Sequence, residues 1–217
     1  MKKILVLGAG RSATTLIDYL ISNSEENNWF VTVGDFSVEL AEESVGNSEK
    51  AKAIFFNVTD DNQRREEIRN SDIVVSMLPA RMHFLVAEDC VNLKKNLVTA
   101  SYVSDELRKL NEKAKQSGVL LLNEIGLDPG IDHMSAMKVI HRIKEEGGKI
   151  LSFKSSTGGL IAPEYDNNPW NYKFTWNPRN VVLAGNGVSR YRKHGRYKYI
   201  PYHKLFTRLE TISILDY

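Results

Sequence analysis

The sequence is poor in cysteine. Cys90 is the only cysteine among 217 residues, which excludes an internal disulfide and a CxxC-type metal site. Such a composition suits a reducing compartment, so we expect a cytoplasmic protein with no bound metal. The formal net charge of +2 is close to balance. Bulk charge therefore favours neither nucleic acid nor a membrane surface as a partner.

Long apolar runs are also missing. No run approaches the ~20 residues that a bilayer-spanning helix needs. Two lysines precede the apolar residues 4–7, as in a signal peptide, but that stretch is short and Arg11 follows soon after it. A first β-strand is the better interpretation. With 42% hydrophobic and 26% charged residues, the composition is that of a soluble globular protein.

Short β-rich runs alternate with segments of helical spacing. The predicted strands cover residues 2–8, 30–35, 51–57, 72–78, 96–102 and 119–125. Most are continuous apolar runs, which is typical of parallel strands covered on both faces. Six such units with short connections predict an α/β fold, a Rossmann-type doubly wound parallel sheet, over residues 1–135.

The pattern changes after residue 148. Residues 149–156, 172–177, 180–186 and 196–201 are short and β-prone, and Gly, Pro and Asn separate them. Residues 191–200 predict a hairpin that turns at His194 and Gly195. We interpret residues 136–217 as the start of an antiparallel α+β domain for substrate binding or dimerisation, which makes a homodimer possible. The basic run at 190–198 is interpreted as a solvated sheet edge rather than an RNA-binding surface.

A glycine-rich turn follows the first predicted strand. Gly8 permits a tight turn, Gly10 lets a pyrophosphate approach the backbone, and Ala13 lets helix and strand pack closely. Asp35 ends the second strand, where a carboxylate would bind the adenosine ribose. This carboxylate would repel a 2′-phosphate, and no arginine follows it directly. The sequence therefore predicts NAD as the cofactor, with NADP as the alternative.

Other strand ends line the same edge of an open parallel sheet. The predicted cofactor-binding residues are Gly8, Gly10, Arg11, Ser12, Ala13, Asp35, Asn57, Val58, Leu78, Thr99, Ala100 and Ser101. The sixth strand leads to a Pro-Gly turn with Asp128, Asp132 and His133 around it. We predict that Asp132 is the N-cap of the next helix. His133 is interpreted as a packing or orienting residue rather than a base.

Three motifs carry a family resemblance: NEIGLDPGIDH at 123–133, SSTGGLIAPE at 155–164 and NPWNYKFTWNPRNVVLAG at 168–185. Together they resemble the saccharopine dehydrogenase family, and the L-glutamate-forming enzymes in particular. TASYVS at 99–104 is similar to the family's stretch after strand five, and His83 stands where the family often has a histidine. The resemblance extends over all 217 residues, although family members are about twice as long.

The resemblance implies an NAD(P)-dependent oxidoreductase of lysine metabolism. Such an enzyme oxidises the CH–NH bond of saccharopine, a small amino-acid substrate, and water then releases glutamate and 2-aminoadipate semialdehyde. The implied catalytic residues are Asp128, Tyr102 and Thr157, and Ser101 and Asp128 are expected to contact the substrate. Two alternatives stay open. One is a polyamine-forming reductase of the carboxynorspermidine dehydrogenase type. The other is an inactive nucleotide-binding or assembly module.

Overall fold

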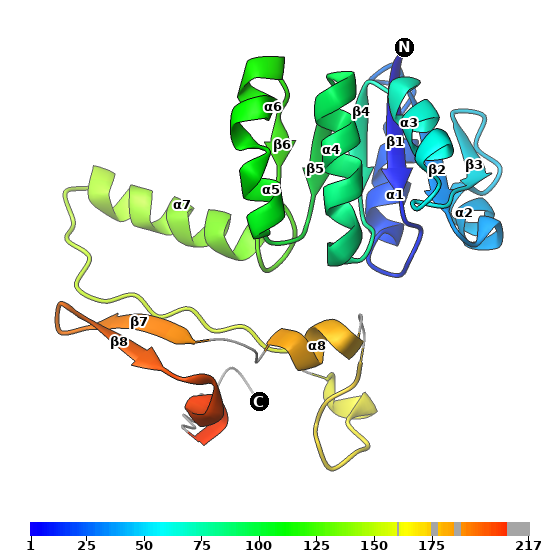
Figure 1. Cartoon of the computed structure of the whole chain (residues 1–217). Helices are drawn as coiled ribbons and strands as arrows, with labels where there is room; N and C mark the ends of the chain where they lie inside the picture. The colour runs from blue at the N-terminus through cyan, green and yellow to red at the C-terminus, as the bar shows by residue number, and fades with distance from the viewer. Residues whose placement is uncertain (160, 175–177, 185–187, 208–217) are drawn as a thin grey trace. The chain divides into compact units, whose positions relative to one another are not determined.

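A computed structural model describes residues 1–217 except 160, 175–177, 185–187 and 208–217. The chain forms two compact units, Met1–Ser155 and Ser156–Tyr217. The division follows the long helix that begins at Ile131, whereas the sequence-based boundary at 135/136 falls inside that helix. Figure 1 shows the elements of each unit.

The first unit is built on a six-stranded parallel sheet. Its order is β3-β2-β1-β4-β5-β6, the doubly wound arrangement in which the direction of winding reverses between β1 and β4. The strands are β1 (Lys2–Leu7), β2 (Trp29–Asp35), β3 (Ala51–Phe55), β4 (Ile73–Ser76), β5 (Asn96–Thr99) and β6 (Leu121–Leu122). The predicted parallel sheet is confirmed. Three strands are shorter than predicted: β4 and β5 have four residues each within the ranges 72–78 and 96–102, and β6 has two within 119–125.

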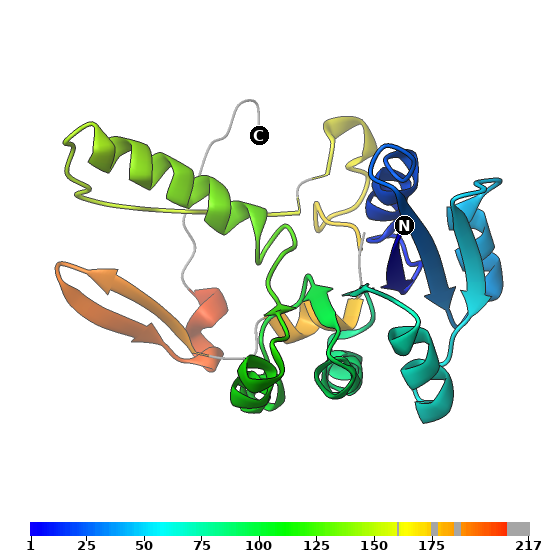
Figure 2. The ribbon, with the colours of Figure 1, turned by 90° about the horizontal axis from the view of Figure 1, so that it is seen from above.

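Helices cover both faces of the sheet. They are α1 (Thr14–Ser22), α2 (Val38–Val45), α3 (Asp61–Arg69), α4 (His83–Leu93), α5 (Asp105–Lys109) and α6 (Asn111–Ser117); the short helix η1 (Ala80–Met82) precedes α4, and α7 (Ile131–Glu145) follows β6. Figure 2 shows α1 on one face and α3 to α6 on the other. Successive side chains of β1 point to opposite faces of the sheet, which explains the two buried clusters. Ile4 and Val6 join one buried cluster, and Leu5 and Leu7 join the other.

A buried ion pair joins α3 to α4. The Arg64 Nε lies 2.7 Å from Asp89 Oδ2, and both side chains are at most 3% exposed. Arg65 Nε donates to the other carboxylate oxygen at 3.0 Å. Arg64 Nη1 also donates to the Val58 carbonyl at 2.5 Å, so the pair holds the loop after β3 as well as the two helices.

The second unit contains short elements. They are η2 (Pro163–Tyr165), α8 (Pro178–Ala184), β7 (Ser189–Lys193), β8 (Arg196–Ile200) and η3 (Tyr202–Thr207). The predicted hairpin is confirmed: β7 pairs antiparallel with β8, and His194 and Gly195 turn between them with φ of 50° and 75°. The β-prone interpretation is wrong for 149–156 and 172–174, which form no strand, and for 180–184, which are helical. Residues 175–177 and 185–186 of those segments lie outside the described residues.

Pro178 explains the helix at 180–184. A proline is favoured at the first position of a helix, because its fixed φ suits the helix and its missing N–H leaves no bond unmade there. The β-branched residues Val181 and Val182 then continue that helix rather than a strand.

No helix in the described part of the chain has both the length and the hydropathy that are needed to cross a bilayer.

Candidate functional site: the carboxyl edge of the sheet

The turn after β1 requires glycine at position 8. Gly8 has φ of 103°, and its N–H donates to the Gly34 carbonyl at 2.8 Å. A Cβ at this position would lie 3.0 Å from the Met77 carbonyl oxygen. The glycine therefore lets the turn pass close to the end of β4, at the point where the order of the strands reverses.

Gly10 faces open space instead. A Cβ built on Gly10 would meet no atom within 4 Å. Ala13, 1% exposed, packs beneath the turn and donates its N–H to the Gly10 carbonyl at 2.8 Å. No side chain caps the N-terminus of α1. Open space over a glycine beside uncapped helix N–H groups fits a dinucleotide's pyrophosphate.

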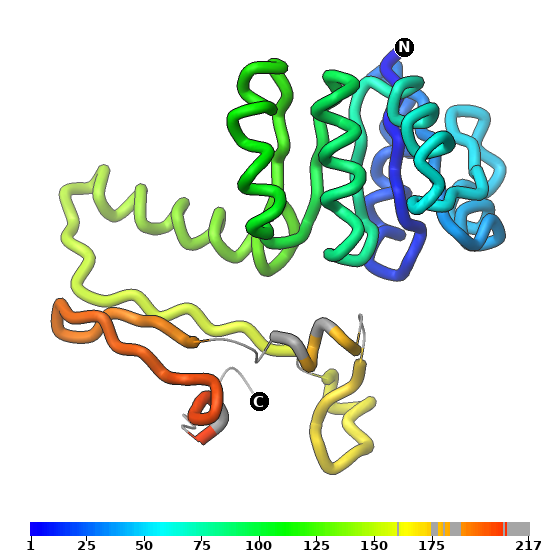
Figure 3. Tube along the Cα trace, viewed as in Figure 1, coloured from blue at the N-terminus to red at the C-terminus, as the bar shows by residue number. Residues whose placement is uncertain are grey.

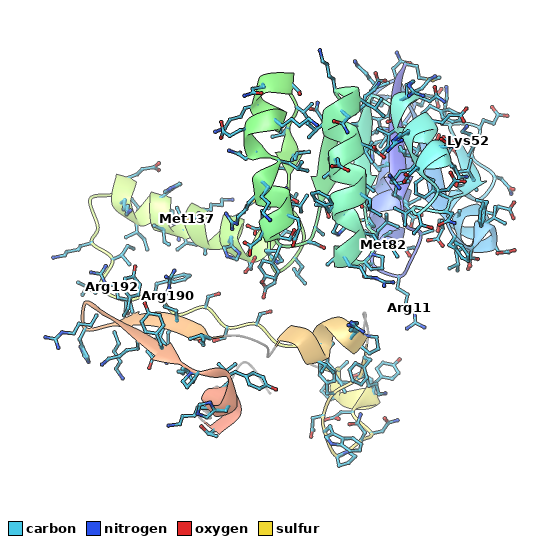
Figure 4. The ribbon with its side chains drawn as sticks, in the orientation of Figure 1. Arg11, Lys52, Met82, Met137, Arg190 and Arg192 are labelled. Atoms are coloured by element: carbon cyan, nitrogen blue, oxygen red, sulfur yellow. The ribbon has the colours of Figure 1, made fainter. Side chains whose placement is uncertain are left out.

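Arg11 and Ser12 complete this turn, and both are exposed. Figure 4 shows the Arg11 side chain at the edge of the unit, directed away from the sheet. Their predicted contacts with a cofactor remain predictions.

Asp35 ends β2, as the sequence predicted, and it lies beside the glycine-rich turn. Its Oδ2 accepts the Ala9 N–H at 2.7 Å, and its Oδ1 accepts the Ser37 N–H at 2.9 Å. The carboxylate thus joins the end of β2 to the turn after β1. A ribose hydroxyl that binds here would donate a hydrogen bond to a carboxylate whose orientation these two backbone N–H groups already fix.

The remaining cofactor candidates differ in what their side chains contact. Asn57 Oδ1 accepts the N–H and the hydroxyl of Thr59 at 3.1 Å and 2.8 Å. The side chain of Val58 is buried in the hydrophobic core, and Leu78 packs against that same core. Any contact of Val58 with a cofactor would therefore come from its backbone. The side chain of Ala100 packs near Gly126, where an added Cβ would lie 3.0 Å away.

A buried histidine lies beneath this edge. His83, 1% exposed, begins α4. Its Nδ1 lies 2.9 Å from Ser76 Oγ, and its Nε2 lies 2.8 Å from Ser101 Oγ. Burial lowers the pKa of His83 to about 4, so the ring is neutral at ordinary pH. The sequence indicated His83 only as a family position, because no local pattern shows that the ends of β4 and β5 converge on it.

Tyr102 and Asp128 form a pair in the loops that follow β5 and β6. The Tyr102 hydroxyl donates to Asp128 Oδ1 at 3.0 Å, and both side chains are exposed. Partial burial and then the hydrogen bond to Asp128 raise the pKa of Tyr102, so the phenol keeps its proton. Two of the three residues that the resemblance implies as catalytic therefore contact each other.

Glu124 is a neighbour that the sequence analysis did not single out. Its Oε1 accepts the Val103 N–H at 3.1 Å, and its φ is 63°. Its negative charge adds a smaller contribution to the raised pKa of Tyr102. Its place in the NEIGLDPG motif, four residues before Asp128, was the available signal.

The corner at 126–132 is closed by its own backbone. The Gly126 N–H donates to the Pro129 carbonyl at 2.8 Å, and the Ile131 N–H donates to the Gly126 carbonyl at 2.9 Å. The Asp128–Pro129 peptide is cis. Gly130 has φ of 150°, and a Cβ there would overlap the Gly126 backbone. Figure 3 follows the chain through this corner into α7.

The prediction that Asp132 is the N-cap of α7 is wrong. Gly130 occupies that position, and Asp132 is the second helical residue. Its Oδ1 accepts the Gly130 N–H at 2.9 Å, so it still satisfies a backbone donor at the start of the helix. The same oxygen lies 2.7 Å from His133 Nδ1, and this contact raises the pKa of His133. His133 is exposed, so it is a hydrogen-bond partner of Asp132 rather than a packing residue.

Thr157 is exposed and belongs to the second unit. Its predicted role beside the nicotinamide stays a prediction. Within the described ranges, no three His, Cys, Asp or Glu side chains gather to hold a metal ion.

Comparison with known proteins agrees with this arrangement. Residues 4–122 match the family model of the saccharopine dehydrogenase NADP binding domain, and residues 126–217 match that of the saccharopine dehydrogenase C-terminal domain. The chain is 40% identical over 195 residues to saccharopine dehydrogenase [NADP(+), L-glutamate-forming] of Saccharomyces cerevisiae, covering 90% of this chain and 43% of that protein. It is also 40% identical over 209 residues to alpha-aminoadipic semialdehyde synthase of Arabidopsis thaliana, covering 88% of this chain and 20% of that protein.

A solved structure is similar over the whole chain. It is the apo histidine-tagged saccharopine dehydrogenase (L-Glu forming) from Saccharomyces cerevisiae, with a TM-score of 0.85 and 36% identity. The match covers 100% of this chain and 48% of that one, so the chain spans half the length of these relatives or less. Both family models and these relatives agree, and the chain belongs to the saccharopine dehydrogenase family.

Proposed function

We propose that the chain supplies the dinucleotide site and the amine-binding wall of an NAD(P)-dependent oxidoreductase that acts on the CH–NH bond of saccharopine. The observation that carries the proposal is the Tyr102–Asp128 hydrogen bond at the ends of β5 and β6. In a parallel sheet these ends share one edge with the glycine-rich turn after β1. The names of the relatives favour saccharopine over a polyamine precursor.

The bound dinucleotide would supply the hydride acceptor. The residues that fit it are Gly10 and the N-terminus of α1 for the pyrophosphate, and Asp35 for the ribose. Positioning is their contribution to the reaction, because aligning a substrate carbon against a cofactor removes much of the entropic barrier.

Atom balance fixes which bond is oxidised. The carbon that becomes the aldehyde of 2-aminoadipate semialdehyde must lose the hydride. The glutamyl carbon keeps its nitrogen and is not oxidised. Water then adds to the carbon of the resulting C=N bond, and cleavage of the C–N bond releases glutamate with its amine.

Asp128 and Tyr102 serve the nitrogen in this sequence. The Asp128 carboxylate accepts a hydrogen bond from the substrate amine or ammonium, which places the C–H bond for transfer. Tyr102 keeps its proton because its pKa is raised, so it orients Asp128 as a donor and does not act as a base. Glu124 adds negative charge beside the same cation.

The choice between the two dinucleotides is set at β2. The family model and the fungal relatives name NADP, which favours NADP for this family. Asp35 places a carboxylate where the ribose would bind, and exposed Phe36 and half-buried Ser37 follow it. We propose that Asp35 shifts this chain toward NAD, because a carboxylate repels a 2′-phosphate. Titration of the chain with NADH and with NADPH tests this directly, and tighter binding of NADPH would refute it.

Self-association through the second unit and a cytoplasmic location also remain proposals. Analytical ultracentrifugation of the chain tests the first: a single monomeric species at all concentrations would refute it. Microscopy of a fluorescent fusion in its own host tests the second, and signal confined to an organelle would overturn it.

The central experiment has two stages. Reduced dinucleotide is titrated against the protein by fluorescence, and saccharopine-dependent formation of reduced dinucleotide is then followed by absorbance. Asp128→Asn should leave dinucleotide affinity unchanged and lower kcat/KM for saccharopine about 10- to 100-fold, the value of a hydrogen bond to a charged group. Asp105→Asn, which removes an exposed carboxylate from α5, should change neither quantity. Dinucleotide binding without turnover would instead support the inactive module.

A further inference from the structure

His83 takes no direct part in the reaction above, yet it contacts the predicted substrate residue Ser101. It lies between Ser76 at the end of β4 and Ser101 just after β5. Ser76 and His83 are buried, and Ser101 is half-buried. The inference below rests on the proposed function, because it assigns Ser101 a role toward the ligand of that site.

Each ring nitrogen has one serine partner. Nδ1 lies 2.9 Å from Ser76 Oγ, and Nε2 lies 2.8 Å from Ser101 Oγ. Thr99 Oγ1 lies 3.4 Å from Nδ1 and 3.2 Å from Nε2. Both Thr99 contacts are longer than the serine contacts, so the two serines are the main hydrogen-bond partners of the ring.

Proton counting selects one tautomer. A neutral imidazole has one N–H donor and one acceptor nitrogen. If Nδ1 carried the proton, Ser76 Oγ would accept it, and the hydroxyl hydrogen of this fully buried serine would have no acceptor, since its side chain makes no second hydrogen bond to the described residues. A buried donor without an acceptor is unfavourable, because it has lost its hydrogen bond to water and gained none in return. Ser76 therefore donates to Nδ1, and Nε2–H donates to Ser101 Oγ.

This arrangement determines what Ser101 can offer. Its oxygen accepts from His83, so its own hydrogen has no partner within the network. Ser101 N–H lies 3.4 Å from Thr99 Oγ1, which leaves the hydroxyl hydrogen unaffected. We propose that His83 is a positioning residue that keeps the Ser101 O–H directed toward a ligand oxygen. The oxygen is either the carboxamide of the nicotinamide or a carboxylate of the amino-acid substrate.

Two further facts support the assignment. Burial keeps His83 neutral, which the fixed one-donor arrangement requires. Tyr102, which follows Ser101 in the chain, donates a hydrogen bond to Asp128. A ligand held by Asp128 would therefore lie near Ser101.

The first test needs no ligand. The whole chain is labelled with ¹⁵N-histidine, and the ring signals are recorded between pH 5 and 8. His83 is assigned by the disappearance of its signals in His83→Gln. We expect His83 to stay neutral over this range, with its proton on Nε2. A proton on Nδ1, or a charged His83 ring near pH 6, would overturn the inference.

The second test locates the ligand oxygen. Ser101→Ala should weaken binding about 5-fold, the value of one hydrogen bond. A loss for NADH but not for ADP-ribose, which lacks the nicotinamide, would identify the carboxamide. A loss only for saccharopine at saturating NADH would identify the substrate carboxylate. No loss for either ligand, or an equal loss for NADH and ADP-ribose, would refute the role of Ser101.

A third comparison separates positioning from folding. His83→Gln retains an N–H donor toward Ser101, whereas His83→Leu does not. We expect His83→Leu to reproduce the Ser101→Ala loss and His83→Gln to recover part of it. Equal losses in both variants would contradict the assigned donor. If wild-type chain binds no dinucleotide, the proposed function fails, and the tautomer measurement still decides the hydrogen-bond network.

Discussion

Replacement of Gly10 by alanine should separate folding from dinucleotide binding. A methyl group at Gly10 would meet no atom within 4 Å, and the backbone there has no positive φ. We therefore expect the free energy of unfolding to change by no more than about 0.5 kcal/mol. The same methyl would occupy the space that a pyrophosphate needs. Forcing a methyl group into a close contact costs about 1–3 kcal/mol, or about 5- to 150-fold in Kd.

Gly8→Ala is the matched control. Its added Cβ would lie 3.0 Å from the Met77 carbonyl oxygen at φ of 103°, so we expect a loss of about 1–3 kcal/mol in the free energy of unfolding. Urea unfolding measures stability, and titration with reduced dinucleotide measures affinity. Wild-type affinity in Gly10→Ala would show that no pyrophosphate lies over this turn. Destabilisation of Gly10→Ala equal to that of Gly8→Ala would refute the open space assigned to Gly10.

Three further changes test other parts of the account. Asp35→Asn should raise the affinity for NADPH relative to NADH about 10-fold, since a charge pair near 4 Å is worth about 1–4 kcal/mol; an unchanged ratio in fluorescence titrations would show that Asp35 does not face the ribose. Asp89→Asn should lower the free energy of unfolding by about 3 kcal/mol in urea, because buried Arg64 then keeps only its ion pair with exposed Asp61, whereas exposed Glu88→Gln should have little effect. The pKa of His83 is lowered to about 4, so the unfolded chain binds the extra proton, and stability should fall by about 3 kcal/mol between pH 6.5 and 4. His83→Gln should lack this part of the pH dependence, and identical pH profiles of variant and wild type would contradict the burial assigned to the ring.

The parallel sheet could be predicted because its signal is local. The continuous apolar run at residues 4–7 is buried on both faces of the sheet, and the turn at Gly8 ends it. The glycine-rich turn and Asp35 were predictable for the same reason, because the fingerprint lies within one βαβ unit. Tyr102 and Asp128 came from motifs at successive strand ends, which parallel topology brings to one edge.

The rest depended on information that is not local. The strand propensity of Val181 and Val182 was outweighed by Pro178 at the start of α8. Asp132 has a favoured N-cap side chain, but the closed corner at Gly126–Gly130 starts the helix two residues earlier. The bonds of His83 join residues up to 18 positions apart along the chain, so only the folded chain shows that it holds Ser101.

We expect one dinucleotide to extend from the glycine-rich turn to the Tyr102–Asp128 pair. A crystal structure of the chain with bound NADH measures this most directly. We predict the pyrophosphate over Gly10 at the N-terminus of α1 and the nicotinamide ring facing Tyr102 and Asp128. A nicotinamide ring directed away from that pair, with the pyrophosphate still in place, would contradict the proposed active site.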